Sequence, residues 1–333
     1  MRSKFGVLII AVACVFAASM SVLAEGPPPW AYGFNTPPGV EAPAAAPAAA
    51  PPAPDPSPRH VPGSDKEFTR PQIANQYGPA DWFPGDHGPM PDIVEHGRKD
   101  AMIAACSLCH YPNGKGRPEN AGVAGLPISY FIQTMHDFRD GLRKSGDPRK
   151  ANTNRMISFA KNMTDDEIKA AAEYFGAMKW TPWMTKVVES NMVPKTRPNN
   201  GMFLMLEGNE KEPLGQRLIE TPVNAEATEM LRNDHSGFIV YAPPGSLKKG
   251  EALVKTGAGR TTACGVCHGQ DLRGLGPVPG LAGRSPSYIG RQLYDMQAGF
   301  RKGEWTSLMK PVVAQLTDND MIAITAYIAS MTP

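Results

Sequence analysis

The chain has 333 residues, with 34 lysine and arginine side chains against 32 aspartate and glutamate side chains, so its formal net charge is +2. Nothing in this balance resembles the basic footprint of a nucleic-acid-binding protein, so we expect no nucleic-acid partner. The length is typical of two domains.

The first 24 residues have the pattern of a secretory signal peptide. Arg2 and Lys4 precede an apolar run over 5–22, and small residues ending at Ala24 suit cleavage there. The pattern predicts export to the periplasm. Two alternatives stay open, namely a run kept as a membrane anchor and a lipid attached at Cys14.

Proline and alanine dominate residues 25–63. Such a stretch cannot build a core, and we expect a disordered, extended tether. Residues 64–90 mix aromatic residues with Gly and Pro. They are predicted to wrap a domain surface without regular structure.

Two C-x-x-C-H motifs are the strongest chemical signal, at 106–110 and 264–268. Two thiols three positions apart can each form a thioether to one vinyl group of the same porphyrin, and the adjacent His then binds the iron. The motifs predict two covalently attached haem c groups. They use Cys106, Cys109, Cys264 and Cys267 for attachment, with His110 and His268 as iron ligands. Zinc binding and a redox-active dithiol are the weaker alternatives.

No cysteine remains for other chemistry. Cys14 lies in the signal segment, and the other four all belong to the two motifs. The mature protein therefore has no cysteine for a disulfide, an iron–sulfur cluster or a catalytic thiol. This excludes a thiosulfate-oxidising enzyme that binds its active haem through Cys.

The sequence after each motif is an internal repeat. His110 and His268 are each followed 20 residues later by Tyr, and Tyr is followed 11 residues later by Gly. A Met, a Thr eight residues on and a Tyr ten residues beyond recur in both copies, and a five-residue insertion ahead of the first Met reconciles the lengths. We therefore expect two haem domains, at 91–179 and 246–333.

Each domain is predicted to be helical. We expect helices leading into the motifs at 93–105 and 247–255, and middle helices at 129–142 and 286–300. The last helices begin at capping boxes, Thr164–Glu167 and its relative Thr317–Asp320. Between the domains, 180–245 forms a connector whose apolar runs at 203–206 and 237–241 predict short strands.

A second axial ligand separates an electron carrier from a catalyst, because an open iron face can bind substrate. Met156 and Met309 occupy matching repeat positions, each expected in a loop ahead of the last helix, and a thioether would raise the haem potential. Rival methionines could fill the same role or simply pack in the core: Met135, Met163, Met178, Met296 and Met321. The other histidines are weaker candidates: His60, His87, His96, His136 and His235.

Neighbouring groups would orient these ligands. A backbone carbonyl is expected to accept a hydrogen bond from each proximal His. Pro279, ahead of Gly280–Gly283, is well placed to shape the loop that follows the second motif, whereas the first domain has no proline at that position. Four repeat residues either contact haem propionates or pack: Tyr130, Tyr288, Arg143 and Arg301.

The second domain resembles the tandem-domain dihaem cytochromes c of bacterial periplasms, through Cys264–Gly269, Pro279–Gly283, Met309 and the helix begun at Thr317. The first domain matches more loosely, since Tyr111 replaces the Gly that follows the motif. The resemblance implies an all-α fold with two class I cytochrome c domains. It also implies iron ligands His110, Met156, His268 and Met309.

The resemblance implies single-electron transfer between periplasmic or membrane-bound redox proteins, with no small-molecule substrate. The protein would be a carrier rather than an enzyme. One alternative is a haem-bearing subunit of a larger dehydrogenase or reductase. A dihaem peroxidase is a weaker one, since it needs an open iron face.

Overall fold

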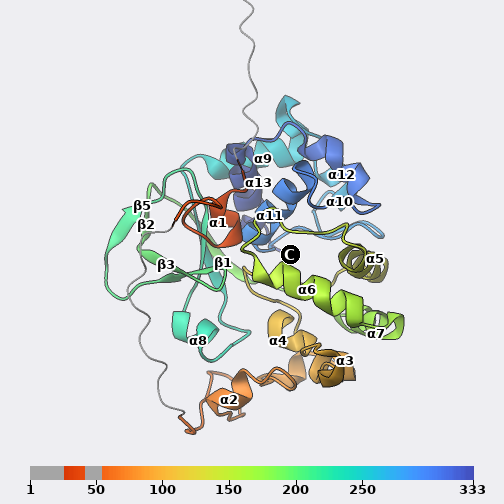
Figure 1. Ribbon diagram of the computed structural model, residues 1–333. Coiled ribbons are helices and arrows are strands. Elements are labelled where there is room, and N and C mark those ends of the chain that lie inside the picture. The colour runs from red at the N-terminus through yellow and green to blue at the C-terminus, as the bar shows by residue number, and fades with distance from the viewer. Residues whose placement is uncertain (1–25, 42–54) are drawn as a thin grey trace, which may run out of the picture.

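The computed structural model describes residues 26–41 and 55–333. Two helical domains, each containing one C-x-x-C-H motif, pack against each other, and a strand-rich connector lies along one side (Figure 1). The predicted signal segment, 1–24, lies outside the described residues, as does 42–54 of the predicted tether. Within the described ranges, no helix is both long and apolar enough to span a bilayer.

The second domain contributes to the larger of the two main hydrophobic cores. Its elements are α9 (Ser246–Thr256), η3 (Gly257–Gly259), α10 (Gly265–His268), α11 (Pro286–Gln297), α12 (Thr306–Val313) and α13 (Asp318–Ser330). Helices α9 and α13 cross closely at Gly250, where a Cβ would lie 2.0 Å from the Ala323 carbonyl oxygen. Glycine there lets the two backbones touch. The apolar faces of α9, α11 and α13 bury one continuous core.

The first domain has a similar arrangement of helices, but the chain segment that precedes its C-x-x-C-H motif differs. It contains α3 (Asp92–Glu95), η2 (Lys99–Ala101), α4 (Cys106–His110), α5 (Ile128–Arg139), α6 (Ala151–Asn162) and α7 (Asp165–Gly176). The helix predicted at 93–105 is wrong. Gly97 and Met102 adopt left-handed backbone angles, with φ of 66° and 56°. The chain therefore turns back on itself, with Arg98 paired to Ile103.

Both predicted capping boxes are present. The Thr164 and Thr317 side chains accept hydrogen bonds from the backbone N–H groups of Glu167 and Asp320. In return, the Glu167 and Asp320 carboxylates accept hydrogen bonds from the backbone N–H groups of Thr164 and Thr317. Acidic residues in the first turn also suit the positive end of the helix dipole. Sequence alone therefore located the start of the last helix in each domain.

The connector is more ordered and more strand-rich than an all-α fold allows. Its strands are β1 (Met184–Glu189), β2 (Met192–Pro194), β3 (Thr196–Asn199), β4 (Met202–Met205), β5 (Lys211–Pro213), β6 (Ile219–Pro222) and β7 (Phe238–Ala242), with α8 (Ala225–Glu229) before the last. The predicted strands at 203–206 and 237–241 are confirmed as β4 and β7. The all-α class is right for the dominant helical content but wrong for this segment.

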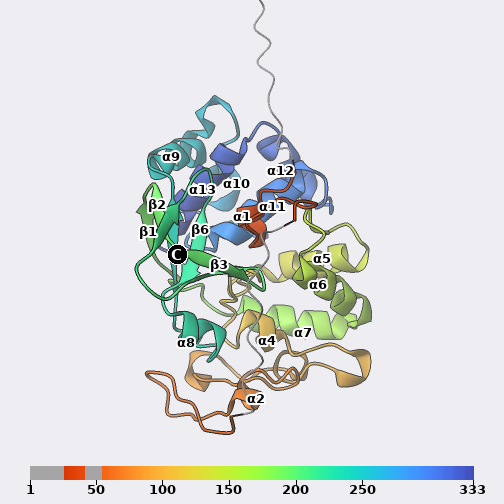
Figure 2. The ribbon, with the colours of Figure 1, turned by 60° about the vertical axis from the view of Figure 1, so that its left-hand side comes forward.

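Three small sheets make up the connector. The largest has the order β1-β7-β6, with β1 parallel and β6 antiparallel to β7, while β2 pairs with β5 and β3 with β4. Figure 2 shows the strands gathered on one side of the molecule, away from α5–α7. Strands β1 and β7 pack against α13, so the connector extends the second domain's core.

The prediction of a disordered tether over 25–63 is wrong for the part that begins at Gly26. Helix α1 (Pro29–Tyr32) buries Trp30, Ala31 and Tyr32 in the second domain's core, where the Trp30 ring packs on Gly290. Figure 1 shows α1 beside α11. Two large aromatic side chains in a proline-rich stretch supply the apolar surface that the alanines lack.

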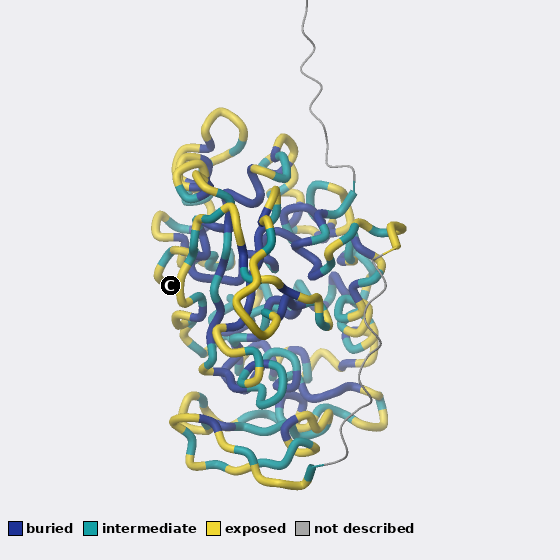
Figure 3. The backbone as a smooth tube through the Cα atoms, turned by 90° about the vertical axis from the view of Figure 1, so that its left-hand side faces the viewer, coloured by how far each residue is buried: buried dark blue, intermediate teal, exposed yellow. Residues whose placement is uncertain are grey.

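The segment over 55–90 forms a thin outer layer. It contains only α2 (Arg70–Ile73) and η1 (Pro84–Asp86). Its small core is Val61, Ile73 and Trp82. This layer, at the bottom of Figure 3, is mostly exposed or half-buried. The Trp82 indole N–H donates to the Leu231 carbonyl, so the layer is joined to the connector.

Candidate haem sites

Each C-x-x-C-H motif forms one short helical turn, α4 or α10, that brings two thiols and one imidazole to the same cavity. Directly after the His, the chain leaves the turn with a positive φ, 63° at Tyr111 and 83° at Gly269. Glycine accepts this angle freely. For Tyr111 it costs on the order of 1–3 kcal/mol, which surrounding contacts must offset.

A backbone carbonyl orients both imidazoles, as the sequence predicts. Nδ1 of His110 donates to the Ala121 carbonyl and Nδ1 of His268 to the Pro279 carbonyl, each at 2.8 Å. Both carbonyls lie 11 residues after their His. Burial lowers the pKa of each ring and keeps it neutral. Nε2 is therefore the nitrogen free to bind iron.

Each His shares its cavity with the Met at the matching repeat position. In the first domain, two adjoining hollows meet at His110 and Met156, and Cys106 and Cys109 line one of them. In the second domain, a single cavity is lined by Cys264, Cys267, His268 and Met309. The donor set, two thiols, a neutral imidazole and a thioether around an apolar space, fits haem c.

The expected loop position of the two methionines is wrong, because Met156 lies in α6 and Met309 in α12. Among the rivals, Met135 and Met163 also line the first cavity and Met296 the second. The cavities therefore do not by themselves single out the ligand. Among the methionines that line these cavities, only Met156 and Met309 recur at the same repeat position.

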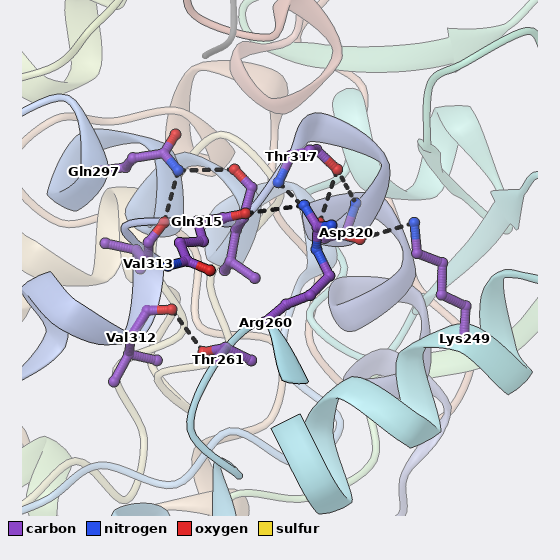
Figure 4. Close-up of polar contacts among 10 residues, drawn as sticks. Lys249, Arg260, Thr261, Gln297, Val312, Val313, Gln315, Thr317 and Asp320 are labelled. Atoms are coloured by element: carbon purple, nitrogen blue, oxygen red, sulfur yellow. Dashed lines mark hydrogen bonds and ion pairs between the residues drawn. The ribbon is translucent and has the colours of Figure 1, made fainter. Parts of the chain in front are cut away.

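Side chains that the sequence analysis missed hold the end of each methionine helix. In the second domain, the Gln297 side-chain amide donates to the Val313 and Leu316 carbonyls, at 2.6 and 2.8 Å, and the Thr261 hydroxyl donates to the Val312 carbonyl (Figure 4). Arg260 joins the Gln315 carbonyl to the Asp320 carboxylate. Helix α12 is thereby fixed at the turn after Met309.

The first domain uses the same arrangement with a different residue. Arg139, nine positions after Tyr130 as Gln297 is after Tyr288, donates to the Ala160 and Met163 carbonyls. Arg98 joins the Asn162 carbonyl to Glu167. Comparing the two copies for residue type could not reveal the match, because Arg and Gln are chemically different.

The two domains are joined by a crosswise set of contacts between repeat residues. Arg143 donates to the Tyr288 hydroxyl at 2.9 Å, and Arg301 donates to the Tyr130 hydroxyl at 2.8 Å. Both arginines also donate to Gln292. Burial raises the pKa of Tyr130, but the two arginines outweigh it and bring the pKa down to about 8. The four residues thus lie between the domains.

The same interface brings the two cavities together. Five residues line both the first-domain and the second-domain cavity: Leu126, Tyr130, Thr134, Tyr288 and Gln292. Each middle helix therefore forms part of the wall of the other domain's site. The two prosthetic-group sites face each other across one layer of side chains.

The five-residue insertion of the first repeat adds charge to its cavity. The longer segment, between Gly141 and Met156, contains Lys150, a buried residue that lines the cavity with His110 and Met156. Burial and the nearby Arg291 lower the pKa of Lys150. A propionate would supply the counter-charge that this ammonium needs.

The alternative chemistries find little support in the geometry. Burial raises the pKa of the Cys106 thiol to about 12 and of the Cys264 thiol to about 11, whereas a redox-active cysteine needs a lowered pKa. Among the described residues, no three His, Cys, Asp or Glu side chains form a metal-binding cluster. None of the five other histidines lines a haem cavity.

Comparison with known proteins agrees with this geometry. The cytochrome c family model matches twice, over 94–179 and 247–332, which together exceed half of the chain. A thiosulfate dehydrogenase electron acceptor from Stutzerimonas stutzeri (strain A1501) is 37% identical over 243 residues, covering 72% of this chain and 84% of the relative. Cytochrome c4 from Stutzerimonas stutzeri is 33% identical over 240 residues, covering 69% and 85%.

A crystal structure of reduced recombinant cytochrome c4 from Pseudomonas stutzeri aligns with a TM-score of 0.44 at 19% identity, covering 68% of this chain and 93% of that one. The two family matches and the two sequence relatives carry the assignment. This chain belongs to the cytochrome c family, as a tandem-domain dihaem member that binds two haem c groups covalently and transfers electrons.

Proposed function

We propose that the first haem is attached through Cys106 and Cys109 with His110 and Met156 as iron ligands. The second haem would use Cys264 and Cys267 for attachment, with His268 and Met309 as ligands. The observation that carries this assignment is that each cavity is lined by one motif and by the Met at the matching repeat position. Met135, Met163 and Met296 have no such counterpart.

When bound, haem supplies a one-electron ferric–ferrous couple. The chain's own residues orient and tune it. The Ala121 and Pro279 carbonyls fix the imidazole tautomer, and the methionine sulfur favours the ferrous state. The apolar walls exclude water, which also favours the less charged ferrous form.

Electrons would pass between the two sites through the shared wall at the domain interface. The crosswise bonds of Arg143 to Tyr288 and of Arg301 to Tyr130 hold the domains in one orientation. A fixed orientation keeps the two prosthetic groups at one separation, so each transfer occurs without a domain rearrangement.

We place the protein in the periplasm as a carrier rather than an enzyme, with redox proteins as partners. Two supports are the signal-like segment at 1–24 and a Met available to occupy the second axial position in each domain. The alternative is a subunit of a larger dehydrogenase complex, favoured by the relative named as a thiosulfate dehydrogenase electron acceptor. Affinity purification at native expression separates these, since only a subunit retains a stoichiometric partner.

Ferric-state electron paramagnetic resonance tests the ligand assignment. With a His and a Met on each iron, both haems are low-spin. We expect two low-spin signals of equal intensity and no high-spin signal. A high-spin signal equivalent to one haem per chain would contradict the proposal and favour a peroxidase-type enzyme with an open iron face.

A further inference from the structure

The surfaces around the two haem sites differ, although the two domains are copies of one repeat: apolar side chains are exposed around the second site and are largely covered around the first. In the second domain, Val266 is 62% exposed, Leu275 is 59% exposed and Leu308 is 73% exposed. Val266 precedes the attachment residue Cys267, Leu308 precedes Met309 and lines the cavity mouth, and Leu275 pairs through its backbone with the cavity residue Val278. We call these three residues the second-domain rim.

The equivalent surface of the first domain is covered by the chain itself. Leu108, which matches Val266, is only 9% exposed, and Ser107 is 1% exposed. Ser107 donates to the Val94 carbonyl at 2.7 Å, and Ala105 donates to the Gln76 carbonyl in the outer layer. The position that matches Leu308 is Arg155, which is exposed but charged rather than apolar.

Connector residues complete this cover. The Tyr111 ring is 2% exposed, meets the Trp183 ring edge-on and lies beneath the Arg232 guanidinium. The Asn113 side chain donates to the Asp234 carbonyl. The strained backbone at Tyr111 is thus offset by contacts that attach the connector to the first motif. Gly269, the counterpart of Tyr111 in the second domain, has no side chain on which a covering segment could pack.

We propose that redox partners dock on the second-domain rim, and that the connector and the outer layer prevent docking at the first motif. This inference rests on the proposed electron-transfer function. A partner's donor centre would lose one electron at this rim and reduce the second iron from ferric to ferrous. Exchange with the first haem would then occur across the domain interface.

Charge indicates the partner's chemistry. Apart from five buried charged residues, residues 246–333 contain seven lysine and arginine side chains against four aspartate and glutamate side chains. Exposed Lys310 lies two positions from Leu308. An apolar patch with cationic surroundings fits a redox protein that presents an apolar patch flanked by carboxylates.

A gold electrode coated with a mixed monolayer of methyl-terminated and carboxylate-terminated thiols presents this chemistry without an identified partner. Voltammetry on that surface measures the rate of direct electron exchange. Leu308→Glu and Val266→Glu each place a carboxylate in the rim, and we expect each to slow exchange about tenfold at low salt. Val266 lies further from Met309, so it controls for disturbed ligation at Leu308.

Two variants of the first domain complete the design. Met102→Glu alters a side chain that is also 73% exposed, and Asn154→Glu alters an exposed side chain two positions before Met156. We expect the exchange rate of both to stay within about twofold of the unmodified protein. Slowing by Asn154→Glu or Met102→Glu equal to that of the rim variants would overturn the proposal, as would unchanged rates for both rim variants.

A mediated redox titration in solution separates this inference from the proposed function. Dissolved mediators bypass docking, so all four variants should still show two one-electron steps. If the unmodified protein shows no such steps, the electron-transfer function itself fails. If the steps are present and the rim variants exchange normally, only the docking inference fails.

Discussion

At the scale of single residues, the two proposed iron ligands of each site are held differently. The imidazole is hydrogen-bonded through Nδ1, whereas the Met offers only a thioether on a helix. Its position depends on how firmly that helix is held. A substitution of the Met should therefore remove one proposed iron ligand while the domain still folds.

We expect Met309→Ala to convert only the second haem to a high-spin form, and Met156→Ala only the first. Removing the sulfur leaves water or an open position on that iron while the imidazole stays oriented. Ferric electron paramagnetic resonance and visible spectra measure the change. Met296→Leu is the matched control, and a high-spin haem in that variant alone would transfer the ligand role to Met296.

At the scale of elements, the ends of α6 and α12 are fixed by Arg139 and Gln297, which sit at one repeat position. Gln297→Ala leaves the Val313 and Leu316 carbonyls without these partners, at a cost of about 1–3 kcal/mol. Met309 should then leave its site more readily. We expect cyanide to bind the second ferric haem about tenfold more tightly.

Arg139→Ala should produce the same change at the first haem only. Cyanide titrations followed by visible absorption measure both affinities. The account of these helix ends fails if either variant weakens cyanide binding, or if the two variants act on the same haem.

The join between the connector and α11 predicts a pH effect. Glu220 of β6 accepts bonds from the Ser285 hydroxyl and the Ser287 N–H, yet burial raises its pKa from 4.5 to about 7. Because the pKa of Glu220 is higher in the folded than in the unfolded state, its protonated form stabilises the fold. This contribution to the free energy of unfolding is fully present below pH 4.5 and is lost as the pH rises to 7. The loss is about 3 kcal/mol.

Glu220→Gln keeps an oxygen acceptor but has no charge to bury. Denaturant unfolding should therefore give the variant and the unmodified protein similar free energies of unfolding at pH 4.5. At pH 8 the free energy of unfolding of the variant should be higher by about 3 kcal/mol. Glu207→Gln, which makes the same chemical change at an exposed position of the connector, is the matched control for unrelated pH effects. Equal pH dependence with and without Glu220 would refute the assignment.

Sequence patterns predicted those parts of the structure that depend on local chemistry. The two motifs, the capping Thr164 and Thr317, and strands β4 and β7 all carry short-range signals. What failed depends on distant contacts. Residues 93–105 do not form one helix because the backbone reverses at Gly97 and Met102, and the proline-rich segment is ordered because Trp30 meets the second domain's core.

At the scale of the whole molecule, α1 and the domain interface act together. The Tyr32 hydroxyl donates to Asp295 at 2.5 Å, and the same carboxylate oxygen accepts from the Gly146 N–H of the first domain. Arg291 donates to the Ala31 and Pro118 carbonyls. The N-terminal segment thus connects both domains, although the repeat contains no counterpart for it.

We expect Trp30→Ala to reduce the free energy of unfolding by about 3–5 kcal/mol, because it leaves a cavity between α1 and α11. Denaturant unfolding measures the loss. Val40→Ala, at a 54% exposed position of the same segment, should leave stability nearly unchanged. Equal stability of the Trp30 variant and the unmodified protein would show that the segment contributes nothing to the fold.

The most direct measurement is the intact mass of the purified, denatured chain. The account predicts the mature polypeptide plus two haem groups that survive denaturation, and only one after Cys264→Ala and Cys267→Ala are combined. A mass equal to the polypeptide alone, or two haems still attached in that double variant, would contradict it.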